Sequence, residues 1–406
     1  MRELAVEQAL VGRQPIYRQG VDVFAYELLY RNSDLNEAVF TNGDRATAQV
    51  LLNTFLEIGL DQVVGPNLAF VNIPRSFLLS DYCSSLPKDR VVLEILEDCV
   101  PDKPLINSLS SLAKKGYQIA LDDFSYSEWF RPLLEISNIV KLDIQAQSRE
   151  SISGQIASLR QYDLKILAEK VKPHEEFDFC KKLGFDYYQG YFFCKPNIVS
   201  GEKLPFNRVA ALRLVAKLQD PKATMAEIEQ TVGQDVAVSY KLLRYVNSAT
   251  NAVKRKIESI RHAVTLVGTK RIRSWASLIM FAGMDDKPRE LMITAIVRAR
   301  MCEQLGTAMR QQNGDQFFTV GLFSVLDALL DHPMAEALEL LPFAEEIHNA
   351  ISDHAGLMGA ALHCVLAYER GDWNETVCRN LDHETIRDAY MNSVGWTRAM
   401  MSELGI

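Results

Sequence analysis

The stretch that decides the fold of this chain is residues 118–144, QIALDDFSYSEWFRPLLEISNIVKLDI, in which two short apolar runs carry charged residues near their downstream ends. Gln118–Phe124 and Ile139–Ile144 have the length and composition of buried β-strands. The charged residues within these runs are Asp122, Asp123, Lys141 and Asp143. Because a buried charge is costly unless it is paired or bound to a metal ion, the runs predict strands that carry a functional site at their ends.

Further runs of the same kind extend this pattern over residues 10–193, with longer amphipathic stretches between most of them. The helical spacing of apolar residues is clear in Ala46–Ile58 and Pro104–Lys115. Repeated strand and helix units predict an α/β fold, and eight strands fit a TIM-like (β/α)8 barrel. The expected strands are Val11–Tyr17, Val23–Tyr30, Leu68–Ile73, Val91–Leu96, Gln118–Phe124, Ile139–Ile144, Lys165–Val171 and Tyr187–Phe193.

The strand pattern stops after Pro196, and residues 197–205 form a polar stretch with glycine and proline that is typical of a linker. Beyond it the chain looks helical, and Gly233 and Gly268 are expected to end helices. We therefore expect two domains, a barrel of residues 1–199 and an all-α domain of residues 200–406. Helices are expected at Asn207–Leu218, Thr224–Val232, Val236–Ser248, Ser259–Val267, Thr269–Phe281 and Arg289–Met309.

The overall composition limits the classes of partner. The chain has 406 residues and a formal net charge of -8, so it exerts no general attraction on a polyanion, which argues against nucleic acid as a partner. No stretch approaches the roughly 20 apolar residues of a membrane span, and residues 1–10 lack an apolar signal core. The seven cysteines are scattered and contain no Cys-x-x-Cys, which favours buried thiols over a disulfide framework. A cytoplasmic protein without membrane contact is expected.

Charged or amide side chains stand inside or directly after most of the expected strands. The downstream ends of barrel strands converge on one rim, where active sites are built. Any one of these residues alone is better explained as a salt-bridged group at a strand end. Together, several acids with one lysine favour a site for divalent cations, and oxygen ligands favour Mg²⁺ or Mn²⁺ over zinc. The residues are Glu27, Asn72, Glu94, Asp122, Asp123, Lys141, Asp143, Glu169 and Gln189.

These segments resemble, in order along the chain, the motifs of the EAL-domain phosphodiesterases, and the resemblance spans about residues 10–196. Residues 26–31, YELLYR, correspond to the signature that names the family, and residues 14–16, QPI, resemble its opening strand. The other matches are Asn72 in VNI, residues 94–97 (EILE), 121–124 (LDDF), 141–143 (KLD), 168–169 (AE), 189–191 (QGY) and Pro196.

The resemblance implies hydrolysis of one phosphodiester of cyclic di-GMP to linear pGpG, with one or two Mg²⁺ or Mn²⁺ ions. The implied ligands of the first ion are Glu27, Asn72, Glu94 and Asp122. Those of the second ion are Asp122, Asp123 and Asp143. Lys141 would hold the attacking water and offset phosphoryl charge, and Glu169 would be the general base or a ligand that orients this water. Gln189 would support the site by hydrogen bonding, Arg31 would contact the ligand's phosphate, and Glu97 would anchor the loop after Asp123.

The chain departs from the family pattern at two places beside this site. The usual loop Asp-Phe-Gly-Thr-Gly is here residues 123–130, DFSYSEWF, so Ser125 and Ser127 replace both glycines. The usual Ala-Glu-Gly-Val-Glu is residues 168–172, AEKVK, which reverses one charge. In the family the glycine loop orders the second metal and the dimer contact. We therefore expect a slow or conditional enzyme, and the alternative is a cyclic di-GMP receptor or protein adaptor without catalysis.

Residues from about 200 onward resemble the HDOD module, a relative of the HD-type phosphohydrolases. The resemblance is clearest at residues 241–247, KLLRYVN, and 260–268, IRHAVTLVG. HD enzymes hold metal with a His-Asp pair, but at the corresponding place in residues 321–327, GLFSVLD, this chain has Ser324 and Val325. The resemblance implies an interaction platform without metal or catalysis, with an unidentified protein partner and a homodimer as further expectations.

Overall fold

The structure of the protein is a computed structural model. In the first half of the chain it describes residues 10–31, 60–96, 99–172 and 174–190. In the second half it describes residues 215–220, 222–233, 287–341 and 343–404, together with a few residues between 212 and 276. The chain divides into two compact units, residues 1–193 with 369–371, and residues 194–368 with 372–406.

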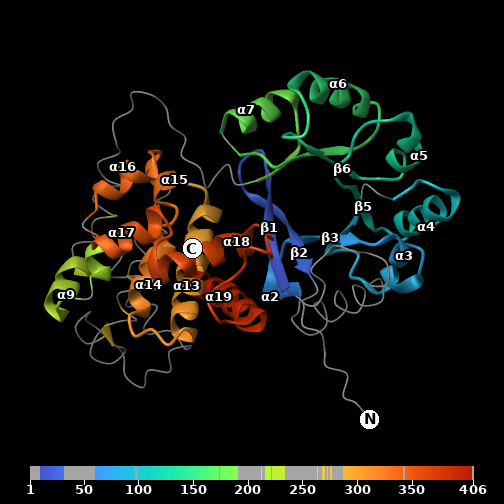
Figure 1. Ribbon diagram of the computed structural model, residues 1–406. Helices are drawn as coiled ribbons and strands as arrows, with labels where there is room; N and C mark the ends of the chain where they lie inside the picture. The colour runs from blue at the N-terminus through green and yellow to red at the C-terminus, as the bar shows by residue number, and fades with distance from the viewer. Residues whose placement is uncertain are drawn as a thin grey trace, which may run out of the picture. The chain divides into compact units, whose positions relative to one another are not determined.

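Eight strands close a barrel in the first unit, which confirms the α/β barrel predicted from the sequence (Figure 1). The strands are β1 (Leu10–Arg18), β2 (Val23–Arg31), β3 (Leu68–Ile73), β4 (Val91–Ile95), β5 (Gln118–Leu121), β6 (Ile139–Asp143), β7 (Lys165–Glu169) and β8 (Tyr187–Gln189). From β2 to β8 neighbouring strands are parallel, whereas β1 is antiparallel to both β2 and β8. Residues 19–22 are too short for a crossover helix, so a hairpin joins the first two strands.

Helices lie on the outside of the barrel strands in Figure 1. They are α2 (Leu60–Val64), α3 (Arg75–Leu78), α4 (Lys103–Lys114), α5 (Arg131–Leu134), α6 (Arg149–Leu159) and α7 (His174–Leu183). The Asp102 side chain caps α4 by accepting a hydrogen bond from the Leu105 N–H at 3.0 Å, and the helix then buries Leu105, Leu109 and Leu112. The predicted helix Ala46–Ile58 lies outside the described residues.

The alternation of side chains along a strand explains why polar groups gather at one end of the barrel. One interior layer consists of Ile16, Ala25, Phe70, Val92, Ala120, Ile139 and Leu167. Since side chains two residues apart share a face, the next layer is polar. It holds Glu27, Asn72, Glu94, Asp122, Lys141 and Glu169. Because β1 runs in the opposite direction, the residue that it contributes to this layer is Gln14, two positions before Ile16.

Five of the expected strands, β4 to β8, end earlier than predicted. β5 ends at Leu121, so Asp122 and Asp123 lie in the turn beyond the strand. β8 ends at Gln189, where the backbone approaches the loop after β7: a Cβ at Gly190 would lie 2.0 Å from the Val171 carbonyl oxygen, and Gly190 has a φ of +148°. Only glycine allows this close approach. The loops that carry the polar residues therefore also determine where these strands end.

All described elements of the second unit are helices, as predicted. They are α9 (Met225–Gly233), α13 (Arg289–Ala308), α14 (Gly314–Phe323), α15 (Leu326–Leu330), α16 (Met334–Glu339), α17 (Glu345–Ser352), α18 (Gly356–Glu369) and α19 (His383–Leu404). α13 packs against α14 and α19. Gly321 allows the first contact, since a Cβ there would lie 2.4 Å from the Arg298 carbonyl oxygen. The helix expected at 236–248 lies outside the described residues. Of those expected at 259–267 and 269–281, only Ala263, Thr269, Ile272, Trp275 and Ala276 are described, all of them helical.

One stretch is an exception to the expectation that no segment approaches a membrane span. By length and composition alone Glu345–Glu369 is long and apolar enough to cross a membrane, and half of its apolar window is buried in the protein. Core helices of soluble proteins pass the same test. The structure divides this stretch into the two helices α17 and α18.

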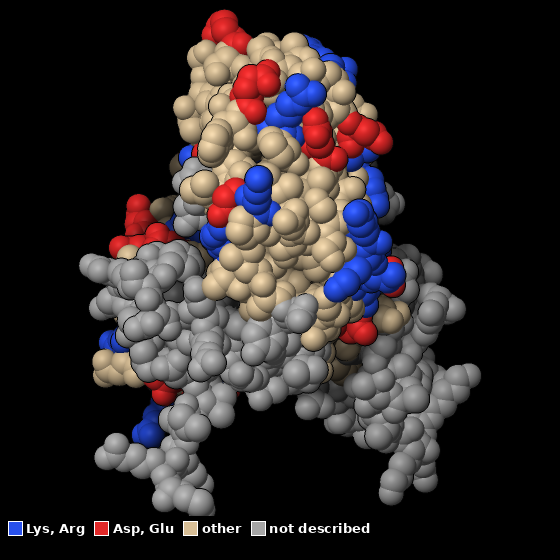
Figure 2. All heavy atoms as spheres, turned by 90° about the vertical axis from the view of Figure 1, so that its right-hand side faces the viewer, with Lys and Arg blue, Asp and Glu red and all other residues tan. Residues whose placement is uncertain are grey.

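The surface of the barrel unit carries mixed charge. Figure 2 shows basic and acidic side chains interspersed over the described part of one face. Ion pairs on this unit include Arg131 with Glu135 at 3.0 Å and Arg90 with Asp61 at 2.8 Å. On the described part of this face no broad area carries a single sign of charge.

Candidate active site

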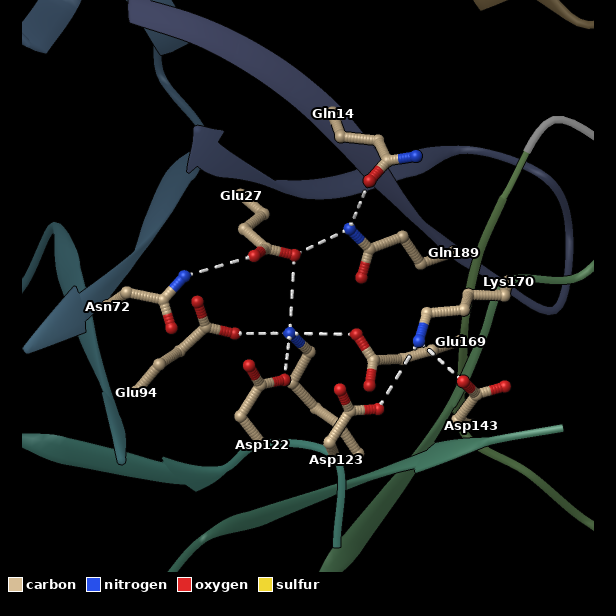
Figure 3. A network of polar contacts seen from close by, with 11 residues as sticks. Gln14, Glu27, Asn72, Glu94, Asp122, Asp123, Asp143, Glu169, Lys170 and Gln189 are labelled. Carbon is tan, nitrogen blue, oxygen red and sulfur yellow. Dashed lines mark hydrogen bonds and ion pairs between the residues drawn. The ribbon is translucent and has the colours of Figure 1, made fainter. Parts of the chain in front are cut away.

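Lys141 on β6 forms ion pairs with four acids inside the barrel. Figure 3 shows these acids, Glu27, Glu94, Asp122 and Glu169, pointing toward one another. The Lys141 Nζ atom is 2.7 Å from Glu94 Oε1 and 2.7 Å from Asp122 Oδ1. It is 2.9 Å from Glu169 Oε1 and 3.2 Å from Glu27 Oε2. With all four acids ionised, one ammonium would face four negative charges. A net negative charge in a buried place is costly, so the cluster favours the binding of a cation or of protons.

Amide side chains hold Glu27 in place. Asn72 Nδ2 donates a hydrogen bond to Glu27 Oε1 at 3.2 Å, and Gln189 Nε2 donates to Glu27 Oε2 at 2.6 Å. Gln189 Nε2 also donates to Gln14 Oε1 at 2.9 Å. The sequence assigned no role to Gln14, because its inward direction depends on the antiparallel course of β1.

Burial changes the acidity of this cluster. Burial, reinforced by the charges of Glu27 and Asp122, raises the pKa of Glu94 well above its usual range despite the opposing effect of Lys141. Burial likewise raises the pKa of Glu169 to about 8. For Lys141, burial favours the neutral form, but the surrounding carboxylates outweigh it and raise its pKa. The lysine therefore stays charged at neutral pH, while burial favours the protonated forms of Glu94 and Glu169.

The donor chemistry of the cluster fits a divalent cation. Glu94 Oε2 and Glu169 Oε2 are buried and accept no hydrogen bond from any described residue. Hard cations such as Mg²⁺ prefer carboxylate oxygens of this kind. As the side chains stand, no three His, Cys, Asp or Glu residues of the described chain are arranged to hold a metal ion. The Lys141 ammonium lies where the carboxylates converge, so a cation bound by them requires this ammonium to move aside.

Asp123 and Asp143 face a different lysine. Lys170 Nζ lies 2.5 Å from Asp143 Oδ2 and 3.5 Å from Asp123 Oδ1, as Figure 3 shows. Burial acts to raise the pKa of Asp143, but its contacts with Lys170 and with backbone amides outweigh this and lower it. The sequence identified a reversed charge near this place but assigned Lys170 no role. The structure thus sorts the predicted acids into two groups, each with its own lysine.

Two predicted contact residues cannot be placed. The backbone of Arg31 ends β2, but its side chain lies outside the described part of the structure, as does the whole of Glu97. The altered loop itself is described. The Tyr126 N–H donates to Gln155 Oε1 at 2.7 Å, and Ser127 Oγ accepts from the Trp129 N–H at 3.4 Å to cap the short 3-10 helix Glu128–Phe130. The loop therefore has hydrogen bonds of its own in place of the two glycines.

In the helical unit, Ser324 and Val325 form the junction between α14 and α15. The Ser324 hydroxyl donates to the Gly321 carbonyl oxygen at 2.7 Å and accepts from Arg298 Nη1 at 3.3 Å. Val325 is buried. The hydroxyl is thus used to close the end of α14, and the absence of a metal here stays a prediction.

The fold and site define a barrel protein with an acidic, lysine-centred polar layer, joined to a helical module. Residues 67–196 match the EAL domain family, and residues 204–339 match the HDOD domain family. A Vibrio cholerae protein named cyclic di-GMP phosphodiesterase CdgJ is 33% identical over 401 residues, covering 96% of this chain and 92% of that protein. The chain belongs to the family of proteins that join an EAL domain to an HDOD domain.

Two further similarities are more distant. The uncharacterized protein YuxH of Bacillus subtilis is 29% identical over 405 residues, covering 97% of this chain and 99% of that protein. Among solved structures, an EAL domain protein from Listeria monocytogenes EGD-e has 19% sequence identity and a TM-score of 0.37, covering 46% of this chain and 87% of that one.

Proposed function

We propose that the protein is a cyclic di-GMP phosphodiesterase that releases linear pGpG. The observation that carries the proposal is the cluster at Lys141, in which acids within or directly after four strands surround one buried ammonium, and two buried carboxylate oxygens accept no hydrogen bond from any described residue. The similarity to the phosphodiesterase CdgJ extends over nearly the whole of both chains. The site and the sequence relationship thus support the same activity.

The proposal includes a divalent cation, Mg²⁺ or Mn²⁺, held at the Lys141 cluster. The residues that would hold it are Glu27, Asn72, Glu94 and Asp122. When bound, such an ion lowers the pKa of a coordinated water and offsets charge on the phosphoryl oxygens. Gln189 and Asn72 orient Glu27 by hydrogen bonds to its two oxygens, so both amides act as positioning residues.

Glu169 is the residue that we propose as the general base. Its Oε1 atom faces Lys141, while Oε2 has no hydrogen-bond donor among the described residues. Beside a bound divalent cation the ionised carboxylate is favoured, and it can then accept a proton from the attacking water at Oε2. The oxygen of this water would form the new bond to phosphorus as the bond to one ribose oxygen breaks, and that ribose oxygen would take a proton from solvent to become the free hydroxyl of pGpG. Once displaced from the carboxylates of the cluster by the cation, the Lys141 ammonium would supply a positive charge beside the phosphoryl group, where charge develops in the transition state.

We propose that the helical half is a platform for a protein partner. We also propose that the protein lies in the cytosol and that it forms a homodimer. The match of residues 204–339 to the HDOD family supports the first part. The described cysteines Cys83, Cys99, Cys180, Cys302, Cys364 and Cys378 are free and buried, which suits a reducing compartment.

The test is hydrolysis of cyclic di-GMP by the full-length protein with Mg²⁺ and with Mn²⁺, with pGpG separated by ion-exchange chromatography. We expect pGpG to accumulate with at least one of the two ions and not in excess EDTA. Titration calorimetry with cyclic di-GMP and Ca²⁺ in place of the active ion measures binding separately. Binding without product under every condition would reject the enzyme in favour of a receptor.

A further inference from the structure

The pair Asp123 and Asp143 already has a positive charge between its carboxylates. Lys170 Nζ contacts Asp143 Oδ2 at 2.5 Å and Asp123 Oδ1 at 3.5 Å (Figure 3). Two carboxylates side by side at the open end of a barrel form an arrangement that ordinarily attracts a divalent cation. Here the chain itself supplies the cation.

Both oxygens of Asp143 already have polar partners, whereas two carboxylate oxygens at the Lys141 cluster have none among the described residues. Oδ1 accepts hydrogen bonds from the backbone N–H groups of Gln145, at 2.7 Å, and Ala146, at 3.2 Å, while Oδ2 binds Lys170. Buried Glu94 Oε2 and Glu169 Oε2, by comparison, accept no hydrogen bond from any described residue. At the first cluster the Lys141 ammonium has to move aside, but a metal ion would then meet two buried carboxylate oxygens that accept no hydrogen bond from any described residue. At the second cluster it would meet an Asp143 whose two oxygens already bind Lys170 and two backbone N–H groups.

The backbone holds Lys170 in this place at a conformational cost. Its φ is +57°, in the left-handed region that favours glycine over a lysine side chain. The loop is fixed on both sides: the Val171 N–H donates to the Gln189 carbonyl oxygen at 3.0 Å, and Glu176 Oε2 accepts from the Lys172 N–H at 2.9 Å. The backbone of Lys170 is thus held in a defined position, from which the side chain reaches both aspartates.

We propose that the Lys170 ammonium takes the place of a second divalent cation between Asp123 and Asp143, so that the barrel binds a single metal ion, at the Lys141 cluster. A divalent ion placed between the two aspartates would be repelled by the ammonium and would lose the ligand oxygen that the ammonium binds. The inference rests on the proposed function for the presence of the first ion. It differs from the assignment of Asp122, Asp123 and Asp143 to a second ion, which the sequence resemblance implied.

The test counts Mn²⁺ ions bound to the full-length protein. Free Mn²⁺ is followed by its electron paramagnetic resonance signal during titration of the wild type and of Lys170→Gly, without nucleotide. Glycine removes the ammonium and suits the positive φ, so this change should not harm folding. We expect the wild type to bind one ion per chain and Lys170→Gly to bind one more, because the two aspartates become available as ligands.

Two controls separate the ammonium from general effects of charge. Lys172→Ala removes a positive charge from the same loop, where the side chain is exposed, and should leave the number of bound ions unchanged. Asp143→Asn in the Lys170→Gly background should remove the added ion. A count that does not increase from wild type to Lys170→Gly would overturn the inference, as would an equal increase in Lys172→Ala.

The outcome is independent of the proposed activity. If the protein hydrolyses no cyclic di-GMP but the count increases as expected, the inference stands and the phosphodiesterase proposal fails. If pGpG is produced while the wild type and Lys170→Gly bind the same number of ions, the activity stands and Lys170 does not replace a metal ion.

Discussion

The Nζ atom of Lys141 lies 2.7 Å from Oε1 of Glu94, and both side chains are completely shielded from solvent. Burying an ion pair brings little net stability, but removing one partner leaves an uncompensated charge. We expect Lys141→Met to lower the free energy of unfolding by about 3–5 kcal/mol, measured by urea denaturation at pH 7 without metal. Lys165→Met, which removes an exposed lysine paired with Asp186 at 2.9 Å, should cost no more than about 1 kcal/mol. Equal losses in the two variants would contradict this prediction.

The stability of the cation-free protein should depend on the protonation of Glu169. Burial raises its pKa from 4.5 to about 8. Between pH 4.5 and about pH 8, Glu169 of the folded protein retains a proton that the unfolded chain releases. The contribution of this group to the free energy of unfolding is therefore greatest below pH 4.5 and declines as the pH rises toward about 8. The slope is up to about 1.4 kcal/mol per pH unit.

Urea unfolding of wild type and Glu169→Gln in EDTA from pH 5 to pH 8 measures this effect. Glutamine does not titrate, so the stability of wild type relative to the variant should fall across the interval. Parallel pH profiles for the two proteins would show that Glu169 does not hold the extra proton.

Most of the barrel could be predicted from the sequence because most strands are short, largely apolar runs that carry a polar group within the strand or directly after it. Asn72 lies two residues after Phe70, and Glu94 lies two residues after Val92. Since side chains two residues apart in a strand share a face, each polar side chain lies on the same inner face as the apolar one. The acids around Lys141 were therefore predictable as one cluster.

The remaining parts of the site depend on tertiary structure. The inward direction of Gln14 follows from the antiparallel β1, which a hairpin at residues 19–22 imposes. The role of Lys170 follows from a left-handed backbone and from the distance between two loops, neither of which a run of residue types reveals. The sequence showed one reversed charge in residues 168–172, where Lys172 replaces a glutamate of the family pattern, but not that Lys170 would contact the two aspartates.

The contact between the loops after β7 and β8 should tolerate no side chain at Gly190. A Cβ there would lie 2.0 Å from the carbonyl oxygen of Val171, which is backbone and cannot rotate away. We expect Gly190→Ala to destabilise the protein by about 4 kcal/mol or more, or to prevent folding. Gly154→Ala, on the helix α6 with no atom within 4 Å of the added Cβ, should be neutral or slightly stabilising. Thermal unfolding followed by circular dichroism compares the two, and a similar effect of both changes would refute the argument.

Glu27→Gln tests which residues hold the cation. The substitution keeps the shape of the side chain but removes its charge and one acceptor for the amides of Asn72 and Gln189. We expect the affinity for Mn²⁺ to fall by about tenfold or more, measured by the same resonance titration. Glu175→Gln, an exposed acid at the start of α7, makes the same change in net charge and should leave the affinity unaltered. Equal affinities in wild type and Glu27→Gln would remove Glu27 from the proposed ligands.

Glu169→Gln is the change that separates chemistry from binding. Replacing Lys141 would mix a folding defect with a loss of catalysis, since that lysine neutralises four acids. Glutamine at 169 keeps the size of the side chain and an oxygen that can accept a hydrogen bond from Lys141, but it cannot take a proton from water. If Glu169 is the general base, kcat should fall by about 10²-fold or more while the Kd for cyclic di-GMP changes by less than about threefold. Rates of hydrolysis with Mn²⁺ give kcat, and calorimetric titration with cyclic di-GMP and Ca²⁺ gives the Kd. A parallel loss of rate and affinity would instead identify Glu169 as a residue that positions the ligand or the cation, and the proton would then have to pass to another acceptor.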